Sequence, residues 1–154
     1  MTELVEAASP SLIAAARELF REYEGALGID LCFQNFEKEL DGLPGDYAPP
    51  GGRLILAMDH ERLKGCVALR PLGRGICEMK RLYVRAESRR TGLGRRLVTA
   101  IIQQARDIGH RRMRLDTSPA MKEAILLYEA LGFLPIAAYR PNPIDGVIYM
   151  ELTL

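Results

Sequence analysis

The feature that most constrains the fold is a glycine-containing turn between a strand-like stretch and a helical stretch. Residues 76–84 are typical of a strand, and apolar positions at helical spacing predict a helix over residues 92–108. The segment between them, Arg89–Arg96, holds two glycines and four arginines. The first turn of a helix has free N–H groups that attract anions, and glycines let an anion approach the backbone closely. The turn therefore predicts a diphosphate site in a domain that mixes strands and helices.

Other nucleotide sites fit this turn less well. A Rossmann site would want a small residue where Leu97 stands, although Asp116 does follow about twenty residues further on. An ATP or GTP loop needs Gly-Lys-Ser/Thr, and the sequence contains no such tripeptide. A tight turn whose arginines are merely solvated remains an alternative.

The remaining residues predict one α/β (α+β) domain over residues 1–154, because this length suits a single core. Glu78 and Lys80 fall in phase with Leu82 and Val84, so we expect a β-bulge that resets the alternation. The predicted N-terminal elements are a strand at 3–6, a helix from Ser9-Pro10 ended by Gly25 and Gly28, a short helix around Phe33, Phe36 and Leu40, and an irregular loop to Gly52. An antiparallel meander of strands at 54–58, 66–72 and 76–84 follows, and then the helix 92–108. The C-terminal elements are a strand at 113–116, a helix begun by Ser118-Pro119 and stopped by Gly132, and strands at 133–139 and 147–152.

Composition excludes several classes of protein. No apolar run approaches the roughly 20 residues that span a bilayer, and no basic and apolar leader precedes the domain, so we expect a cytoplasmic protein with no membrane partner. Cys32, Cys66 and Cys77 lack metal-ligand spacing, which predicts buried fillers and no metal site. A net charge of +1 and the absence of aromatics among the basic residues argue against nucleic-acid binding.

Two motifs in order resemble the GNAT (Gcn5-related N-acetyltransferase) family. The first is Arg89-x-x-Gly92-x-Gly94, and the second is the segment AILLYEALGF at residues 124–133. The resemblance covers essentially the whole chain and implies the GNAT fold, a mixed, mostly antiparallel central sheet flanked by helices. It also implies acetyl-CoA as cosubstrate. One departure is Met121, which stands where many members carry an asparagine that contacts the cofactor.

The resemblance also implies roles for individual residues. Tyr128 would protonate the departing thiolate, and Glu78 would act as general base, because a lysine-like amine is only about 0.1% neutral near pH 7.4. A core aromatic and an ordinary strand glutamate paired with Lys80 or Arg81 are the respective alternatives. The cofactor-binding residues implied are Leu82, Tyr83, Val84, Arg89, Arg90, Thr91, Gly92, Leu93, Gly94, Arg95 and Tyr128.

The predicted activity is transfer of an acetyl group from acetyl-CoA to a primary amine of a small molecule or protein. An acyl-CoA sensor or interaction module without catalysis is the alternative. Residues 1–60 carry eleven acidic and four basic residues, net −7, whereas residues 61–154 carry nine and seventeen, net +8. Because the acidic part would flank the acceptor in the family, we expect a cationic amine. Oligomeric state is open, a homodimer included.

Overall fold

The computed structural model describes residues 1–28 and 35–154, which build one seven-stranded sheet between two layers of helices. The sheet order is β1-β2-β3-β4-β5-β7-β6, and every neighbouring pair is antiparallel except β4 and β5. The strands are β1 (Glu3–Glu6), β2 (Arg53–Asp59), β3 (Arg62–Gly73), β4 (Ile76–Val84), β5 (Arg112–Thr117), β6 (Leu134–Ile136) and β7 (Ile148–Thr153). This arrangement confirms the predicted fold class.

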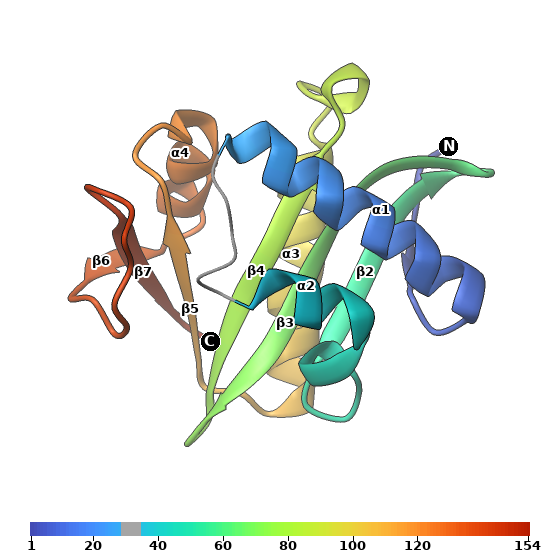
Figure 1. Cartoon of the computed structure of the whole chain (residues 1–154). Coiled ribbons are helices and arrows are strands. Elements are labelled where there is room, and N and C mark those ends of the chain that lie inside the picture. The colour runs from blue at the N-terminus through green and yellow to red at the C-terminus, as the bar shows by residue number, and fades with distance from the viewer. Residues whose placement is uncertain (29–34) are drawn as a thin grey trace.

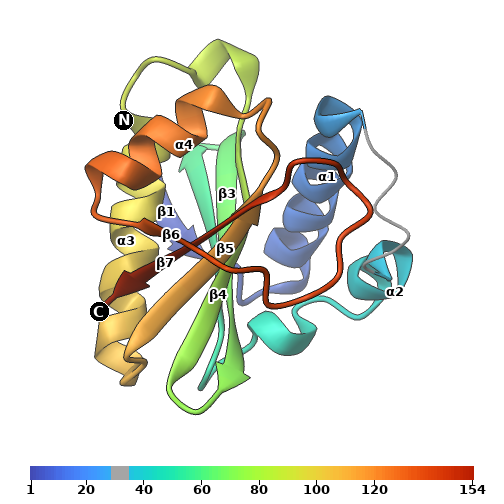
Figure 2. The same ribbon diagram turned by 90° about the vertical axis from the view of Figure 1, so that its left-hand side faces the viewer.

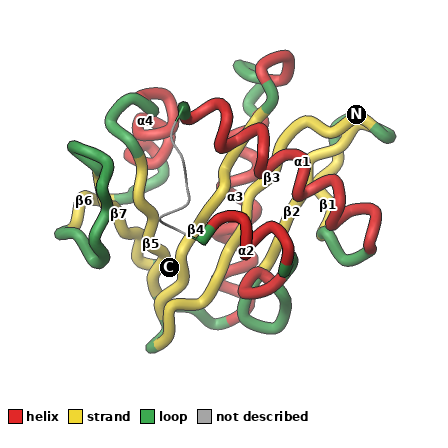
Figure 3. The backbone as a smooth tube through the Cα atoms, in the orientation of Figure 1, coloured by secondary structure: helices red, strands yellow, loops and turns green. Residues whose placement is uncertain are grey.

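Helices cover both faces of the sheet. Figure 1 shows α1 (Pro10–Leu27) and α2 (Phe36–Asp41) in front of it and α3 (Leu93–Ile108) behind it. The side view in Figure 2 shows the same layers with the sheet between α1 and α3, and Figure 3 shows the strands that lie between the two helical layers. The remaining elements are α4 (Lys122–Ala130) and two single turns, η2 (Gly45–Tyr47) and η3 (Ala86–Ser88).

Two cores result, because the central strands bury side chains on both faces. On β2, Leu54 and Leu56 pack toward α1 and α2, whereas Ile55 and Ala57 pack toward α3. Helix α3 contributes Leu97, Val98 and Ile101 at helical spacing, and all three are fully buried. The sheet is therefore fixed between its helices, and its register is set by apolar side chains on each side.

The expected β-bulge is present in β4. Cys66 pairs with Tyr83 and Ala68 with Lys80, so β4 holds one extra residue opposite Val67. Arg81 lies in the bulge and adopts a left-handed backbone conformation, with a φ of 61°. As a result Leu82 and Val84 pack on the core that includes α3, as Met79 does before the bulge.

Several predicted boundaries are wrong. Helix α4 begins at Lys122, because the Ser118 side chain accepts a hydrogen bond from the Ala120 N–H and closes a separate turn. Strand β6 ends at Ile136 rather than at residue 139. Helix α1 passes through Gly25, which was expected to help end it, and stops at Leu27 with the left-handed Gly28 as its C-cap, as predicted. Phe33 and Cys32 lie outside the described residues.

Candidate functional site

The site lies where two parallel strands separate. β4 and β5 pair only at residues 76–78 with residues 112–114, and beyond that point they diverge, as Figure 1 shows. Within the described residues, the β5 side of β4 has no strand partner from Met79 onward. The divergence leaves a cavity and a groove between the carboxyl ends of the two strands. Ligands commonly bind at such a position in sheets with parallel strands.

The turn after β4 presents free backbone donors. Gly92 is the N-cap of α3 and has a left-handed conformation with a φ of 83°. Because it has no side chain, it cannot cap the free N–H groups of the first turn. The first helical bond runs from the Arg96 N–H to the Gly92 carbonyl, so the N–H groups of Leu93, Gly94 and Arg95 have no helical acceptor. The arrangement fits an anion at the positive end of the helix.

Side chains of the turn hold its shape. The Nε of Arg89 donates to the Val84 carbonyl at 2.9 Å, and the Thr91 hydroxyl donates to the Ser88 carbonyl at 2.6 Å. Thr91 and Arg95 do not line the groove, and Leu93 is buried against the core. Thr91 thus stabilises the turn rather than facing a ligand from the groove wall.

A groove of about 640 Å³ leads from this turn toward the diverging strands. Among the residues predicted to bind a cofactor, those that line it are Leu82, Tyr83, Val84, Arg89, Arg90, Gly92, Leu93 and Gly94. A Cβ on Gly94 would meet only Leu127 and Val84, each at 3.9 Å, so the protein itself has room for alanine there. The glycine leaves that room open to a ligand, which fits a phosphate group close to the backbone.

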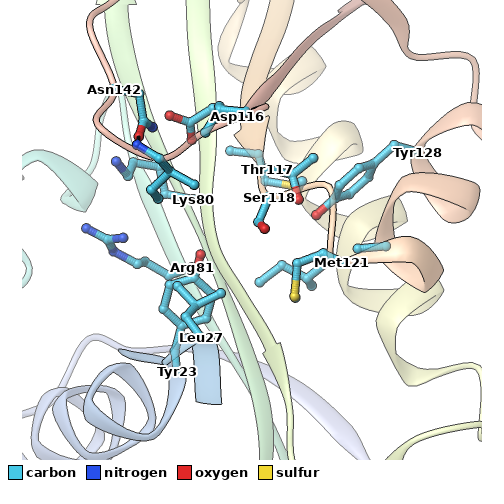
Figure 4. Close-up of a pocket in the computed structure, with 15 residues that line it drawn as sticks. Tyr23, Leu27, Lys80, Arg81, Asp116, Thr117, Ser118, Met121, Tyr128 and Asn142 are labelled. Carbon is cyan, nitrogen blue, oxygen red and sulfur yellow. Dashed lines mark hydrogen bonds between the residues drawn. The ribbon is translucent and has the colours of Figure 1, made fainter. Parts of the chain in front are cut away.

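Tyr128 stands at the inner end of this groove. The groove and the cavity share the lining residues Tyr23, Leu27, Leu82, Met121 and Ala124. Figure 4 shows the Tyr128 hydroxyl pointing into the cavity near Ser118, with Lys80 and Asp116 across from it. Burial raises the pKa of Tyr128, so its phenol keeps its proton at physiological pH. The ring is also part of the core, against Phe133.

Glu78 lies at the centre of a buried ion-pair cluster. Its side chain is 0% exposed. Arg70 donates to Oε1 from Nε at 2.9 Å, the Tyr139 hydroxyl donates to Oε2 at 2.6 Å, and Arg140 pairs with Oε2 through Nη2. Glu78 does not line the cavity that holds Tyr128. Lys80 and Arg81, the partners expected for Glu78, are not its main ones. The Nζ of Lys80 lies 3.9 Å from Glu78 Oε1, and Arg81 binds Glu39 instead.

Sequence reasoning missed the residues that surround this cluster. Burial, and then repulsion from Arg81 and Arg70, lower the pKa of Lys80 to about 7. Asp116 lines the cavity, and its buried Oδ2 has no hydrogen-bond partner among the described residues. Tyr139 and Arg140 come from the connection between β6 and β7, which carries no motif. The one sign of this cluster in the sequence was that Glu78 and Lys80 fall in phase with apolar residues of the strand.

Four carboxylates of the acidic part of the chain are engaged in ion pairs. Glu18 and Glu22 pair with Arg85, at 3.2 and 2.6 Å, and Glu39 pairs with Arg81 at 2.9 Å. Glu37 pairs with Arg21 at the surface. Three arginines therefore meet these four carboxylates, in pairs that join α1 to α2 and join both helices to β4 and the residue after it.

The remaining features to compare with the sequence are the cysteines, possible metal sites and membrane-spanning helices. Cys66 and Cys77 are buried and unbridged, and burial raises the pKa of the Cys77 thiol to about 12, so both suit the predicted filling role. Within residues 1–28 and 35–154 no cluster of His, Cys, Asp and Glu could hold a metal ion. No helix of that part is long and apolar enough to cross a membrane.

The comparisons with known proteins agree with the two motifs. The sequence model of the Acetyltransferase (GNAT) family matches residues 13–133. An uncharacterized N-acetyltransferase of Schizosaccharomyces pombe is 45% identical over 138 residues, which cover 88% of this chain and 85% of the relative. A GNAT-family acetyltransferase structure from Staphylococcus aureus matches with a TM-score of 0.84 at 18% identity, over 99% of both chains.

A second solved structure was determined with a ligand. The Salmonella typhimurium protein yncA, solved with its cofactor acetyl-CoA, matches with a TM-score of 0.75 at 18% identity, over 99% of this chain and 94% of its own. These structures share the fold described above. Because the family model spans most of the chain and a relative is 45% identical, the chain belongs to the acetyltransferase (GNAT) family of acyltransferases.

Proposed function

We propose that the protein transfers the acetyl group of acetyl-CoA directly to a primary amine of a small molecule or a protein. The observation that carries this proposal is the continuity of the site. The groove that begins at the free N–H groups at the start of α3 adjoins the cavity that Tyr128 lines, and the two share five lining residues along the edge of β4 that faces away from β3. A site of that shape suits a long cosubstrate with a diphosphate in its middle and a thioester at its end.

Each part of acetyl-CoA has a matching part of the groove. The diphosphate would accept hydrogen bonds from the N–H groups of Leu93, Gly94 and Arg95, with Arg89 and Arg90 nearby. The pantetheine arm would pair with the backbone of residues 82–84, where the side of β4 that faces away from β3 has no strand partner among the described residues. The Salmonella protein of the same fold was solved with acetyl-CoA, which supports acetyl-CoA as the cosubstrate.

The chemistry requires one base and one acid. The neutral amine nitrogen attacks the thioester carbonyl carbon and forms a C–N bond, and the tetrahedral intermediate then breaks its C–S bond. The amine loses a proton to a base, and the CoA thiolate takes a proton from Tyr128. Its raised pKa keeps Tyr128 protonated until the thiolate forms beside it.

Two carboxylates are candidates for the base. Glu78 is enclosed by Arg70, Tyr139 and Arg140, so it could accept the proton only through an intervening group such as water. Asp116 lines the cavity directly and has an oxygen without a hydrogen bond among the described residues. This geometry favours Asp116 as the direct acceptor and Glu78 as the residue that positions the arginines.

Thiol release from acetyl-CoA in the presence of a panel of primary amines tests the proposal. We expect amine-dependent release, together with an N-acetylated product by mass spectrometry. A calorimetric titration with acetyl-CoA accompanies the assay. Binding without amine-dependent release would favour an acyl-CoA sensor, and absence of binding would refute both functions.

A further inference from the structure

A second pocket, about 460 Å³ in volume, opens beside the cavity that holds Tyr128. We call it the basic pocket, because its charged lining consists of Arg70, Lys80, Arg114, Arg140 and Glu39. Its floor is a row of paired residues across the sheet, in which Arg70 faces Glu78 and Glu78 faces Arg114. Its volume lies in the range typical of small-molecule sites.

Positive charge exceeds negative charge around the basic pocket. Within the described residues, the charged side chains that line the pocket are four cations, Arg70, Lys80, Arg114 and Arg140, and one carboxylate, Glu39. Three of the four cations are arginines, so the lining keeps more positive than negative charge even when Lys80, whose pKa is lowered to about 7, is neutral. The other carboxylates that pair with this lining, Glu78, Asp116 and Glu151, are not among its lining residues.

The surplus faces the pocket because the carboxylates are already engaged. Glu78 alone serves Arg70 and Arg140 and lies 3.9 Å from Lys80. The acidic lining residue, Glu39, is held by two hydrogen bonds from Arg81. Arg114 uses only Nε, toward Glu151, and no hydrogen bond within the described residues engages its Nη groups. Burial and repulsion from Arg70 lower the pKa of Arg140, as expected of crowded cations.

The basic pocket and the cavity are close enough to hold two ends of one small molecule. Lys80 lines both of them. Arg140 lines the basic pocket and approaches Asp116 of the cavity, with Nη1 and Oδ2 4.0 Å apart. An acid group on the arginines and an amine beside Asp116 would therefore be only a few bonds apart.

We infer that the acetyl acceptor is a free amino acid, in which the carbon that bears the primary amine also bears a carboxylate. This inference rests on the proposed function. The arginines receive the carboxylate by charge-assisted hydrogen bonds. Asp116 orients the amine toward the thioester, and the amine exchanges one proton for the acetyl group while CoA leaves as the thiol. The expected cationic acceptor is not supported, because a polyamine would meet a cationic wall.

The test compares amino acids with their carboxamides, which keep the amine and lose the negative charge. We expect kcat/KM for the preferred amino acid to exceed that of its amide by about 10-fold to 100-fold. Arg114→Gln removes a cation of the pocket and should abolish most of this preference. Arg112→Gln is the matched control, since Arg112 pairs with the same Glu151 but is 56% exposed and does not line the pocket. The control should keep the preference.

The outcomes separate this inference from the proposed function. Equal or faster acetylation of amides, alkylamines or polyamines would overturn the inference and leave the acetyltransferase intact. A preference that survives Arg114→Gln would also overturn it. Peptides that begin with aspartate distinguish a side-chain carboxylate from the α-carboxylate of a free amino acid, and their preference would contradict the free amino acid. No thiol release with any amine would refute the proposed function and this inference together.

Discussion

At the scale of single residues, Tyr128 and Glu78 were both predicted to be catalytic, but their side chains lie in different environments. Tyr128 reaches the cavity, whereas Glu78 lies beneath the basic pocket with its oxygens bonded to three neighbours. Both carboxylate oxygens already have partners, and Glu78 does not line the cavity where the amine would lie. Its environment therefore favours a role in positioning.

Replacing Tyr128 with phenylalanine removes the proposed proton donor and keeps the ring. We expect kcat to fall by about 10²–10⁴-fold, while acetyl-CoA affinity and the melting temperature change little. The packing against Phe133 does not need the hydroxyl. Steady-state kinetics and a calorimetric titration provide the measurement. Turnover equal to that of the parent would leave Tyr128 as a core aromatic only.

Replacing Glu78 with glutamine tests the positioning role through stability. The variant leaves the partly buried Arg70 and Arg140 without the counter-charge that they share on the fully buried Glu78 side chain, so we expect a loss of about 3 kcal/mol in the free energy of unfolding. Glu37→Gln is the matched control, because its pair with Arg21 is 61% and 53% exposed and should contribute little. Urea denaturation gives both values. Unchanged stability together with lost turnover would make Glu78 the base.

At the scale of elements, the bulge in β4 and the start of α3 together make the site. The bulge was predictable, because the alternation of charged and apolar residues breaks within residues 78–84. The start of α4 was not, since Ser118-Pro119 is a common helix start and only the local hydrogen bond to Ala120 shows that it closes a turn instead.

Gly94 offers the cleanest test of the diphosphate site. Gly94→Ala adds a methyl group that fits the protein but fills the groove, so we expect acetyl-CoA affinity to fall about 10-fold or more. The helix itself should gain up to about 1 kcal/mol of stability. Gly25→Ala is the control, because a Cβ there, at an exposed position within α1, meets nothing within 4 Å. Gly92 is a poorer probe, since its φ of 83° disfavours any side chain.

Calorimetric titration of both variants with acetyl-CoA decides the point. The expected pattern is weaker binding by Gly94→Ala and parent-like binding by Gly25→Ala, with both proteins folded. Parent-like affinity in both variants would place the diphosphate elsewhere.

At the scale of the whole molecule, the sequence allowed the fold and the cofactor groove to be predicted, but not the acceptor side. Motifs indicated the groove because the lining residues predicted from them lie close together in the chain, between Leu82 and Gly94. The basic pocket joins Arg70, Glu78 and Arg140, and contacts across 62 residues leave no local pattern. Charge totals also carry no information on ion pairing, because a net −7 does not reveal that Glu18, Glu22 and Glu39 pair with arginines.

The most direct measurement of the central claim is a crystal structure of the protein with acetyl-CoA. We expect the diphosphate within hydrogen-bond distance of the N–H groups of Leu93, Gly94 and Arg95. The thioester sulfur should lie next to the Tyr128 hydroxyl, with the arm along residues 82–84. A diphosphate bound away from the start of α3, or a thioester outside the cavity that Tyr128 lines, would contradict the account.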